Sequence, residues 1–392
     1  MIKNIGKITG SNFVYFGTMW LMFAFTSHYY GLTIMGIMAL SASFCAPLLV
    51  LIGLSPRQSI VSGVIDDYLQ YNFLRLSFLV IVGVLFGCCS FFFINDKYNF
   101  RVFLLFSIFK FIESYYEFEY AEKTLNKNFT YISKNQIVRS LQLLIFVVVS
   151  YITKSIIFSI SSIIIYNILI IIKTTNYPIR LRFDFSYLRN IGNSIFMMSL
   201  SSFFVLFFLN TPRYFLASVG IKDVAIYSGL VNIVTIIRML MQSYLNTMIP
   251  FLLDYIKEKD IYKFNSFIIK TIMFLIVVSF VFSAIYIMCG SDILKLIYGK
   301  EFYVTNFTAL FSIGYAFFLC TSMVMNSALI SFREIKAQFS IAIFLTILSI
   351  ILSYILVSKL KINGAFLALN IICSVQAFIS YIVVKKRVKY DR

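Results

Sequence analysis

The chain has 392 residues, of which 60% are apolar or aromatic and only 13% are charged, with a mean hydropathy of +0.89. A soluble domain carries about 25% charged residues, so this composition excludes a soluble globular protein, and 44 Phe with 26 Tyr exclude a disordered chain. The net charge of +18 is typical of a multi-span membrane protein, because cytoplasmic loops of such proteins collect Lys and Arg. We therefore expect no nucleic-acid partner.

The residue types that carry most enzyme chemistry are scarce. The chain has a single histidine, His28, and six cysteines that all lie in apolar stretches without CxxC spacing. We find no paired carboxylates, no nucleophile motif and no phosphate-binding loop. The sequence therefore predicts no metal site, no cofactor and no enzymatic activity, and it disfavours ATP-driven transport.

Membrane-spanning helices are predicted from stretches of roughly 20 residues that lack Asp, Glu, Lys and Arg. The stretch between Lys7 and Arg57 is long enough for two crossings. Single crossings are predicted at 76–95, 155–172, 190–212, 271–291, 302–332, 337–358 and 362–384. Three weaker segments, 102–120, 136–153 and 224–253, bring the prediction to twelve helices.

The basic residues give this topology an orientation. With twelve spans, 23 Lys and Arg lie on the side of the two termini and nine on the opposite side, while Lys110 and Arg238 fall inside spans. Arg75 and Arg139 are counted here among the residues at the cytoplasmic ends of spans. The bias predicts that both termini lie in the cytoplasm.

The spans divide evenly along the chain. The connection 173–189 falls near the middle, so we expect an N-terminal six-helix bundle over 1–172 and a C-terminal bundle over 190–392 with a short basic tail. The segments 30–37 and 219–226 share a Gly followed five residues later by a small residue and an Ile. Together these features predict an all-α duplicated transporter whose halves rock about a central cavity.

Arg238 is the most isolated charge of the chain. It lies 15 residues after Asp223 and 16 before Asp254, which is about 22 Å along a helix. An arginine at such depth costs at least about 2.5 kcal/mol unless it faces a cavity or a partner. It is therefore our main candidate for binding an anionic substrate, and the alternative is a structural arginine that pairs with a Glu or with backbone carbonyls.

A second group of charges lies on one face of the fourth predicted span. Lys110, Glu113 and Glu117 are spaced i, i+3 and i+7. Lys110 is a candidate anion ligand, and Glu113 and Glu117 are candidates for a coupling proton or sodium ion. The alternative is a self-neutralising cluster near the cytoplasmic end or burial against neighbouring helices.

Two further arginines are weaker candidates for a cavity. Arg213 lies at the outer end of the seventh span and Arg57 at the cytoplasmic end of the second. Either could instead snorkel to the interface or follow the cytoplasmic bias of basic residues, and Arg75 has the same alternatives.

Four segments in this order resemble known proteins: 4–36, 53–60, 210–216 (Asn-Thr-Pro-Arg-Tyr-Phe-Leu) and 293–302 (Ile-Leu-Lys-Leu-Ile-Tyr-Gly-Lys-Glu-Phe). They are similar to O-antigen flippases of the Wzx type, within the MOP superfamily that includes MATE-like multidrug transporters. The resemblance covers essentially the whole chain.

The resemblance implies a V-shaped pair of six-helix bundles in the bacterial inner membrane, with a cationic central cavity. It also implies that the protein moves an undecaprenyl-pyrophosphate-linked oligosaccharide, of O-antigen or capsule, to the periplasmic leaflet. Expected partners are this lipid, membrane lipids, H+ or Na+ as coupling ion, and the polysaccharide polymerase machinery. Two alternatives stay open: a multidrug or metabolite antiporter of the same fold, and an O-antigen polymerase.

Overall fold

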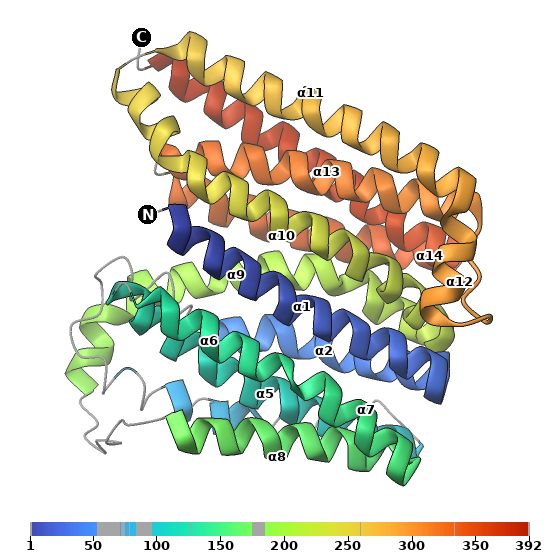
Figure 1. Ribbon diagram of the computed structural model, residues 1–392. Coiled ribbons are helices and arrows are strands. Elements are labelled where there is room, and N and C mark those ends of the chain that lie inside the picture. The colour runs from blue at the N-terminus through green and yellow to red at the C-terminus, as the bar shows by residue number, and fades with distance from the viewer. Residues whose placement is uncertain are drawn as a thin grey trace. The chain divides into compact units, whose positions relative to one another are not determined.

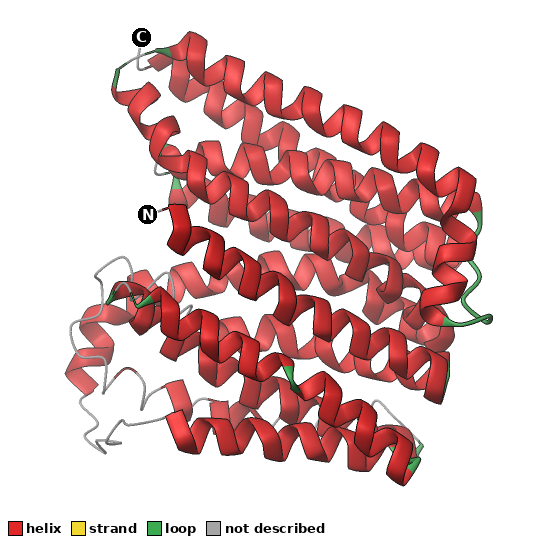
Figure 2. Cartoon of the chain, viewed as in Figure 1, coloured by secondary structure: helices red, strands yellow, loops and turns green. Residues whose placement is uncertain are grey.

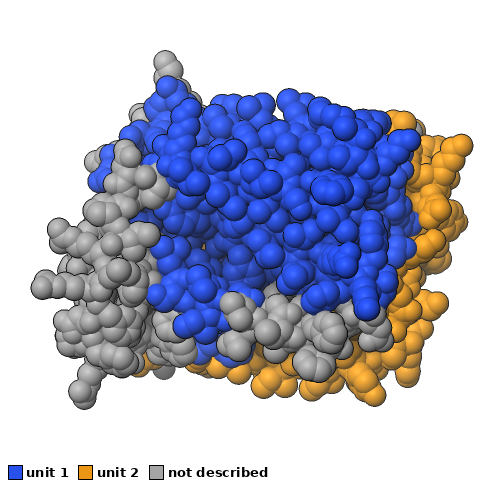
Figure 3. All heavy atoms as spheres, turned by 90° about the horizontal axis from the view of Figure 1, so that it is seen from below, with its two compact units in different colours: residues 1–206 blue, residues 207–392 orange. Residues whose placement is uncertain are grey.

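The computed structural model describes residues 2–52, 71, 75–77, 79–83, 96–126, 128–174, 185–258, 260–332 and 334–390. Throughout these ranges the regular secondary structure is helical (Figures 1 and 2). The chain divides into two compact units, Met1–Leu206 and Phe207–Arg392, which Figure 3 shows in blue and orange. The predicted all-helical architecture is therefore confirmed for the described part of the chain.

The described part of unit 1 is largely helical, and short turns join α1 to α2 and α5 through α8 to one another. Its labelled helices are α1 (Ile2–Tyr30), α2 (Leu32–Ile52), α5 (Lys97–Leu125), α6 (Phe129–Ser140), α7 (Gln142–Thr153) and α8 (Ile156–Thr174). Side-chain caps begin two of them: Asp96 accepts hydrogen bonds from the first amides of α5, and Asn128 accepts one from Tyr131. Gly31 has a φ of +89° and separates α1 from α2, a backbone conformation that glycine adopts without strain.

The core of unit 1 lies where these helices meet. α1 packs against α2, α6 and α7, while α5 packs against α2 and α8. Buried aromatic rings fill the interior, among them Phe106, Phe109 and Phe146. Small polar groups also pack there, since Ser41 on α2 is hydrogen-bonded to Ser107 on α5 at 2.8 Å.

Unit 2 contains the C-terminal end of α9 (Phe185–Val219) and the helices that follow. These are α10 (Ile221–Lys257), α11 (Ile261–Ile285), a five-residue π-helix (Tyr286–Gly290), α12 (Ser291–Tyr298), α13 (Asn306–Ser331) and α14 (Ile335–Tyr390). α13 packs along α14, α10 and α11. α14 is interrupted at Lys361, whose φ of +49° breaks it into two helical segments at the point where two predicted spans adjoin.

A glycine permits one close contact in unit 2. A Cβ atom at Gly229 of α10 would lie 2.6 Å from the ring of Phe302, and the Tyr298 hydroxyl donates a hydrogen bond to the Gly229 carbonyl at 3.0 Å. Tyr298 and Phe302 stack with ring centroids 4.4 Å apart. The segment 293–302, noted above for its resemblance, therefore packs α12 and the following turn onto α10.

Within the described ranges, 8 helical segments are long and apolar enough to cross a membrane, which makes this a multi-span membrane protein. The count of twelve stays a prediction, because 53–70, 72–74, 78 and 84–95 lie outside those ranges. Several predicted span boundaries were wrong: the span predicted at 271–291 begins at Ile261, as α11, and one other case bears on the site. The span expected to begin at residue 136 begins at Phe129, as α6, and continues through a turn at Leu141 into α7.

Candidate functional site

That boundary changes the position of Arg139. It was assigned to a cytoplasmic span end, yet it lies near the middle of the span Phe129–Thr153, and its side chain is only 3% exposed. Its guanidinium carbon lies 3.8 Å from the ring centroid of Tyr116 and 4.4 Å from that of Tyr15. Aromatic faces attract a cation, so the rings stabilise a charge that burial would otherwise make costly.

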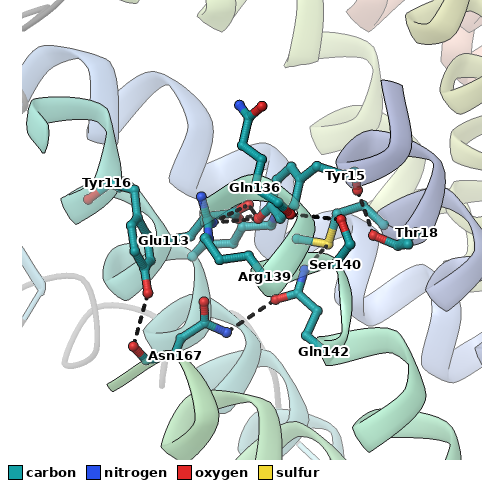
Figure 4. Close-up of polar contacts among 12 residues, drawn as sticks. Tyr15, Thr18, Glu113, Tyr116, Gln136, Arg139, Ser140, Gln142 and Asn167 are labelled. Atoms are coloured by element: carbon teal, nitrogen blue, oxygen red, sulfur yellow. Dashed lines mark hydrogen bonds and ion pairs between the residues drawn. The ribbon is translucent and has the colours of Figure 1, made fainter. Parts of the chain in front are cut away.

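Glu113 is the anion of this cluster; it contacts Arg139 (Figure 4) and Lys110. Its Oε1 lies 3.4 Å from Nη2 of Arg139, and its Oε2 lies 2.7 Å from Nζ of Lys110. The Tyr15 hydroxyl donates to Glu113 and accepts from Arg139 at 2.6 Å. Two basic groups therefore share one carboxylate in the middle of unit 1, which leaves an excess of one positive charge.

Amide side chains extend this network to the other helices of unit 1. Gln136 of α6 accepts a hydrogen bond from Ser11 of α1 at 2.6 Å. Asn167 of α8 donates to Gln142 at 3.1 Å, and its backbone carbonyl accepts from Tyr116 at 3.0 Å (Figure 4). The network thus joins α1, α5, α6, α7 and α8, and satisfied polar networks of this kind hold helices in one arrangement.

Arg75 is the second buried arginine of unit 1. The sequence placed it at a cytoplasmic span end, but the structure buries it completely. Its guanidinium donates to the backbone carbonyls of Ser114 and Tyr115 on α5 and lies 5.8 Å from the Phe118 ring centroid. Glu117, the third residue of the predicted stripe, lies on the same helix as Lys110 and Glu113 and is exposed, and its role as a coupling-ion site stays a prediction.

Arg213 lies in the last turns of α9 in unit 2. Its Nη1 donates to Asn210 at 2.6 Å, and its guanidinium carbon lies 5.7 Å from the Tyr227 ring centroid. Its Nε is buried and has no hydrogen bond within the described structure. Tyr227 also contacts Phe366 of α14, with centroids 4.7 Å apart. The partners of Arg213 among the described residues are therefore neutral.

Arg238 lies at the middle of α10 and is half-buried. In the part of the chain that the structure describes, it forms no hydrogen bond or ion pair, and the ion pairs of unit 2 lie near helix ends. Unit 2 therefore contains two arginines, Arg213 and Arg238, without an acidic partner among its described residues.

The predicted site residues thus fall into different settings. Arg238 and Arg213 lie in unit 2, Lys110 and Glu113 form an ion pair in unit 1, and Arg57 lies outside the described residues. The sequence analysis missed Arg139, although Gln136, Arg139 and Gln142 follow one another at three-residue spacing beside an apolar run. No cluster of metal-binding side chains occurs among the residues that the structure describes.

No protein-family model and no curated protein matches this sequence. Among solved structures, it is similar to an inward-facing multidrug resistance MATE family transporter of the MOP superfamily, at 13% identity over 97% of this chain and 95% of that one, with a TM-score of 0.67. The fold is that of MOP-superfamily transporters. It is also similar to the lipid II flippase MurJ in an inward closed conformation, at 14% identity over 96% and 87%, with a TM-score of 0.71.

A third similar structure is a MOP superfamily transporter from Pyrococcus furiosus, at 12% identity over 99% of this chain and 96% of that one, with a TM-score of 0.61. The binding pocket of that transporter has reverse polarity, which suggests a different function for it. These similarities establish the fold, and the three structures are of transporters or flippases.

Proposed function

We propose that this protein is a flippase that moves an undecaprenyl-pyrophosphate-linked oligosaccharide from the cytoplasmic to the periplasmic leaflet of the bacterial inner membrane. The observation that carries the proposal is the pair Arg213 and Arg238, which have no acidic partner among the described residues of unit 2. The fold shared with transporters and with a lipid II flippase supports it, as does the resemblance of the sequence to O-antigen flippases.

A pyrophosphate needs such cations to enter the membrane. It cannot cross about 30 Å of hydrocarbon unaided. A guanidinium presents several N–H donors in a plane and binds phosphate oxygens in pairs, and these bonds are stronger than those between neutral groups. Arg238, which lies within the candidate span Ile221–Gln242, would offset the charge of the head group inside the hydrocarbon.

Unit 1 has a supporting role in this proposal. The carboxylate of Glu113 is already occupied by Lys110 and Arg139. This pairing makes Lys110 a weaker anion ligand than Arg238, and it makes Glu113 a poor site for a cationic drug. It is the observation that favours a lipid pyrophosphate over a cationic substrate, although an antiporter of the same fold remains the alternative to be tested.

The test is complementation of a deletion strain in the source organism. Arg238→Ala, with normal abundance in the membrane, should abolish surface polysaccharide and leave lipid-linked units on the cytoplasmic leaflet. Leu240→Ala is the matched control, because Leu240 lies two residues away on α10 and is 53% exposed. Arg238→Lys should restore part of the activity, since it keeps the charge without the paired donors.

Three results would contradict the proposal. Full surface polysaccharide in the Arg238→Ala strain would show that this cation has no essential role. Loss of drug resistance in the deletion strain, with normal glycans, would favour the antiporter. Single unpolymerised units on the periplasmic leaflet would indicate a polymerase.

A further inference from the structure

An apolar pocket lies between α10, α11 and α13 in unit 2. Ile233 and Ile237 of α10, Leu275 and Phe282 of α11, and Ala316 of α13 are among the residues that line it. The lining extends from Leu275 on α11 to Tyr286 at the start of the π-helix, which is about 16 Å at 1.5 Å per residue. Most of its lining is apolar; the Ser312 hydroxyl in its wall is hydrogen-bonded to the Ala309 carbonyl at 2.8 Å, whereas the hydroxyl of Tyr286 at one end is buried without a hydrogen bond among the described residues. The pocket therefore suits a hydrocarbon chain.

The helix that closes this pocket on one side is the least embedded in the protein. Only 17% of the α11 span is buried, against at least 28% in the other seven candidate spans. Figure 1 shows α11 along the edge of its unit, and it packs against α13 and α10. Large apolar side chains such as Phe274 and Val277 point away from the unit and are more than 60% exposed. A chain from the bilayer could therefore reach the pocket beside or behind α11.

The charge next to the pocket identifies the kind of lipid. Arg238 lies one helical turn after the lining residue Val234, so the two residues share a face of α10. Its guanidinium has no ion pair within the described structure. An apolar pocket with an unneutralised cation beside it complements a lipid whose anionic group is attached directly to a long hydrocarbon chain.

On the basis of the proposed function, we propose that this pocket holds the first isoprene units of the polyprenyl chain while Arg238 holds the adjoining phosphate. The substrate then keeps part of its chain inside unit 2 during transport instead of leaving the whole chain in the bilayer. A ligand fits both the pocket and Arg238 only if its phosphate is attached directly to its hydrocarbon chain. The pocket therefore selects polyprenyl phosphates over phospholipids, in which a glycerol separates the phosphate from the chains.

Photocrosslinking of the full-length protein in lipid nanodiscs tests this. The probe is undecaprenyl phosphate with a diazirine in the isoprene unit nearest the phosphate. Crosslinks should map to the lining residues of α10, α11 and α13. Ala316→Phe and Ser279→Phe, which place a ring in the pocket from two different helices, should each lower the apparent affinity about tenfold, which corresponds to about 1.4 kcal/mol.

Val277→Phe is the matched control, because Val277 lies on α11 near Ser279 and is 61% exposed. It should leave the crosslinking unchanged. A diazirine-labelled phosphatidylglycerol at the same mole fraction should label the pocket at least fivefold less. Equal labelling by phosphatidylglycerol or by neutral undecaprenol would overturn the proposal, as would crosslinks that persist in both pocket variants.

The crosslinking and complementation experiments can fail independently of each other. If Arg238→Ala abolishes surface polysaccharide but the probe labels residues outside the pocket, the protein is a flippase and the chain site assigned here is wrong. If the probe labels the pocket specifically but Arg238→Ala retains full surface polysaccharide, the chain site stands and the proposed transport role of Arg238 fails.

Discussion

In the ion cluster of unit 1, we expect substitution of Glu113 to destabilise the protein more than substitution of Arg139 does. Glu113 contacts both Lys110 and Arg139, at 2.7 and 3.4 Å, so removing its charge leaves two cations without an anion, one of them only 3% exposed. Removing Arg139 leaves Glu113 paired with Lys110. Tyr15 and Tyr120, which accept hydrogen bonds from Arg139, also keep a partner. Tyr15 still donates to Glu113, and Tyr120 still donates to Asn135 at 2.8 Å.

These contacts give an estimate of the magnitude. Removing one partner of a buried ion pair costs about 3–5 kcal/mol, and the rings around Arg139 and the 18% exposure of Glu113 put Glu113→Gln near the lower end, at about 3 kcal/mol. For a cooperative unit of roughly 200 residues, this lowers the unfolding midpoint by about 6–12 °C. Arg139→Met should cost about 1 kcal/mol less, because it leaves no unpaired charge in the interior.

The measurement is thermal unfolding of the purified full-length protein in detergent, followed with a thiol-reactive dye. A variant that keeps only Cys45, which is buried in α2, reports on unit 1. The double variant Glu113→Gln with Arg139→Met should be more stable than the sum of the single effects predicts. If Arg139→Met lowers the midpoint as much as Glu113→Gln does, the cluster is not organised around a shared carboxylate.

Two further predictions concern backbone conformation and a helix end. Lys361→Gly should raise the free energy of unfolding by about 1 kcal/mol in chemical denaturation, because glycine adopts a φ of +49° without the penalty of a Cβ; a decrease would mean that the Lys361 side chain stabilises the break in α14. Asp260 caps α11 by accepting from the Lys263 amide at 3.0 Å, and the hydrogen bond from the Lys263 side chain is the main cause that lowers the Asp260 pKa below 3.8. The cap therefore stabilises the start of α11 above pH 4, and this effect is lost as the pH falls through the lowered pKa of Asp260. Below that pKa, the amides of residues 261–264 should be less protected from hydrogen exchange, after correction for intrinsic rates. Asp260→Ala should show the same weaker protection at pH 7, and unchanged exchange in that variant would contradict the role of the cap.

Much of the candidate site was predictable from the sequence. The sequence separates Arg238 from the nearest charged residues by 15 or more positions on one predicted helix. In the structure it lies near the middle of α10 and forms no ion pair among the described residues. The i, i+3 spacing of Lys110 and Glu113 likewise led to an ion pair within one helix. Such contacts depend on local geometry alone.

What the sequence determined by itself is that the chain is helical, crosses a membrane several times and carries a few charges at depth, because the thickness of the bilayer and the cost of an unpaired charge apply to any apolar helix. Only the tertiary structure decided which of these charges are neutralised. Arg139 meets Glu113 across 26 residues and Tyr15 across 124. Spacing along the chain defines the face of a helix, but the neighbour that this face meets depends on how all the helices pack.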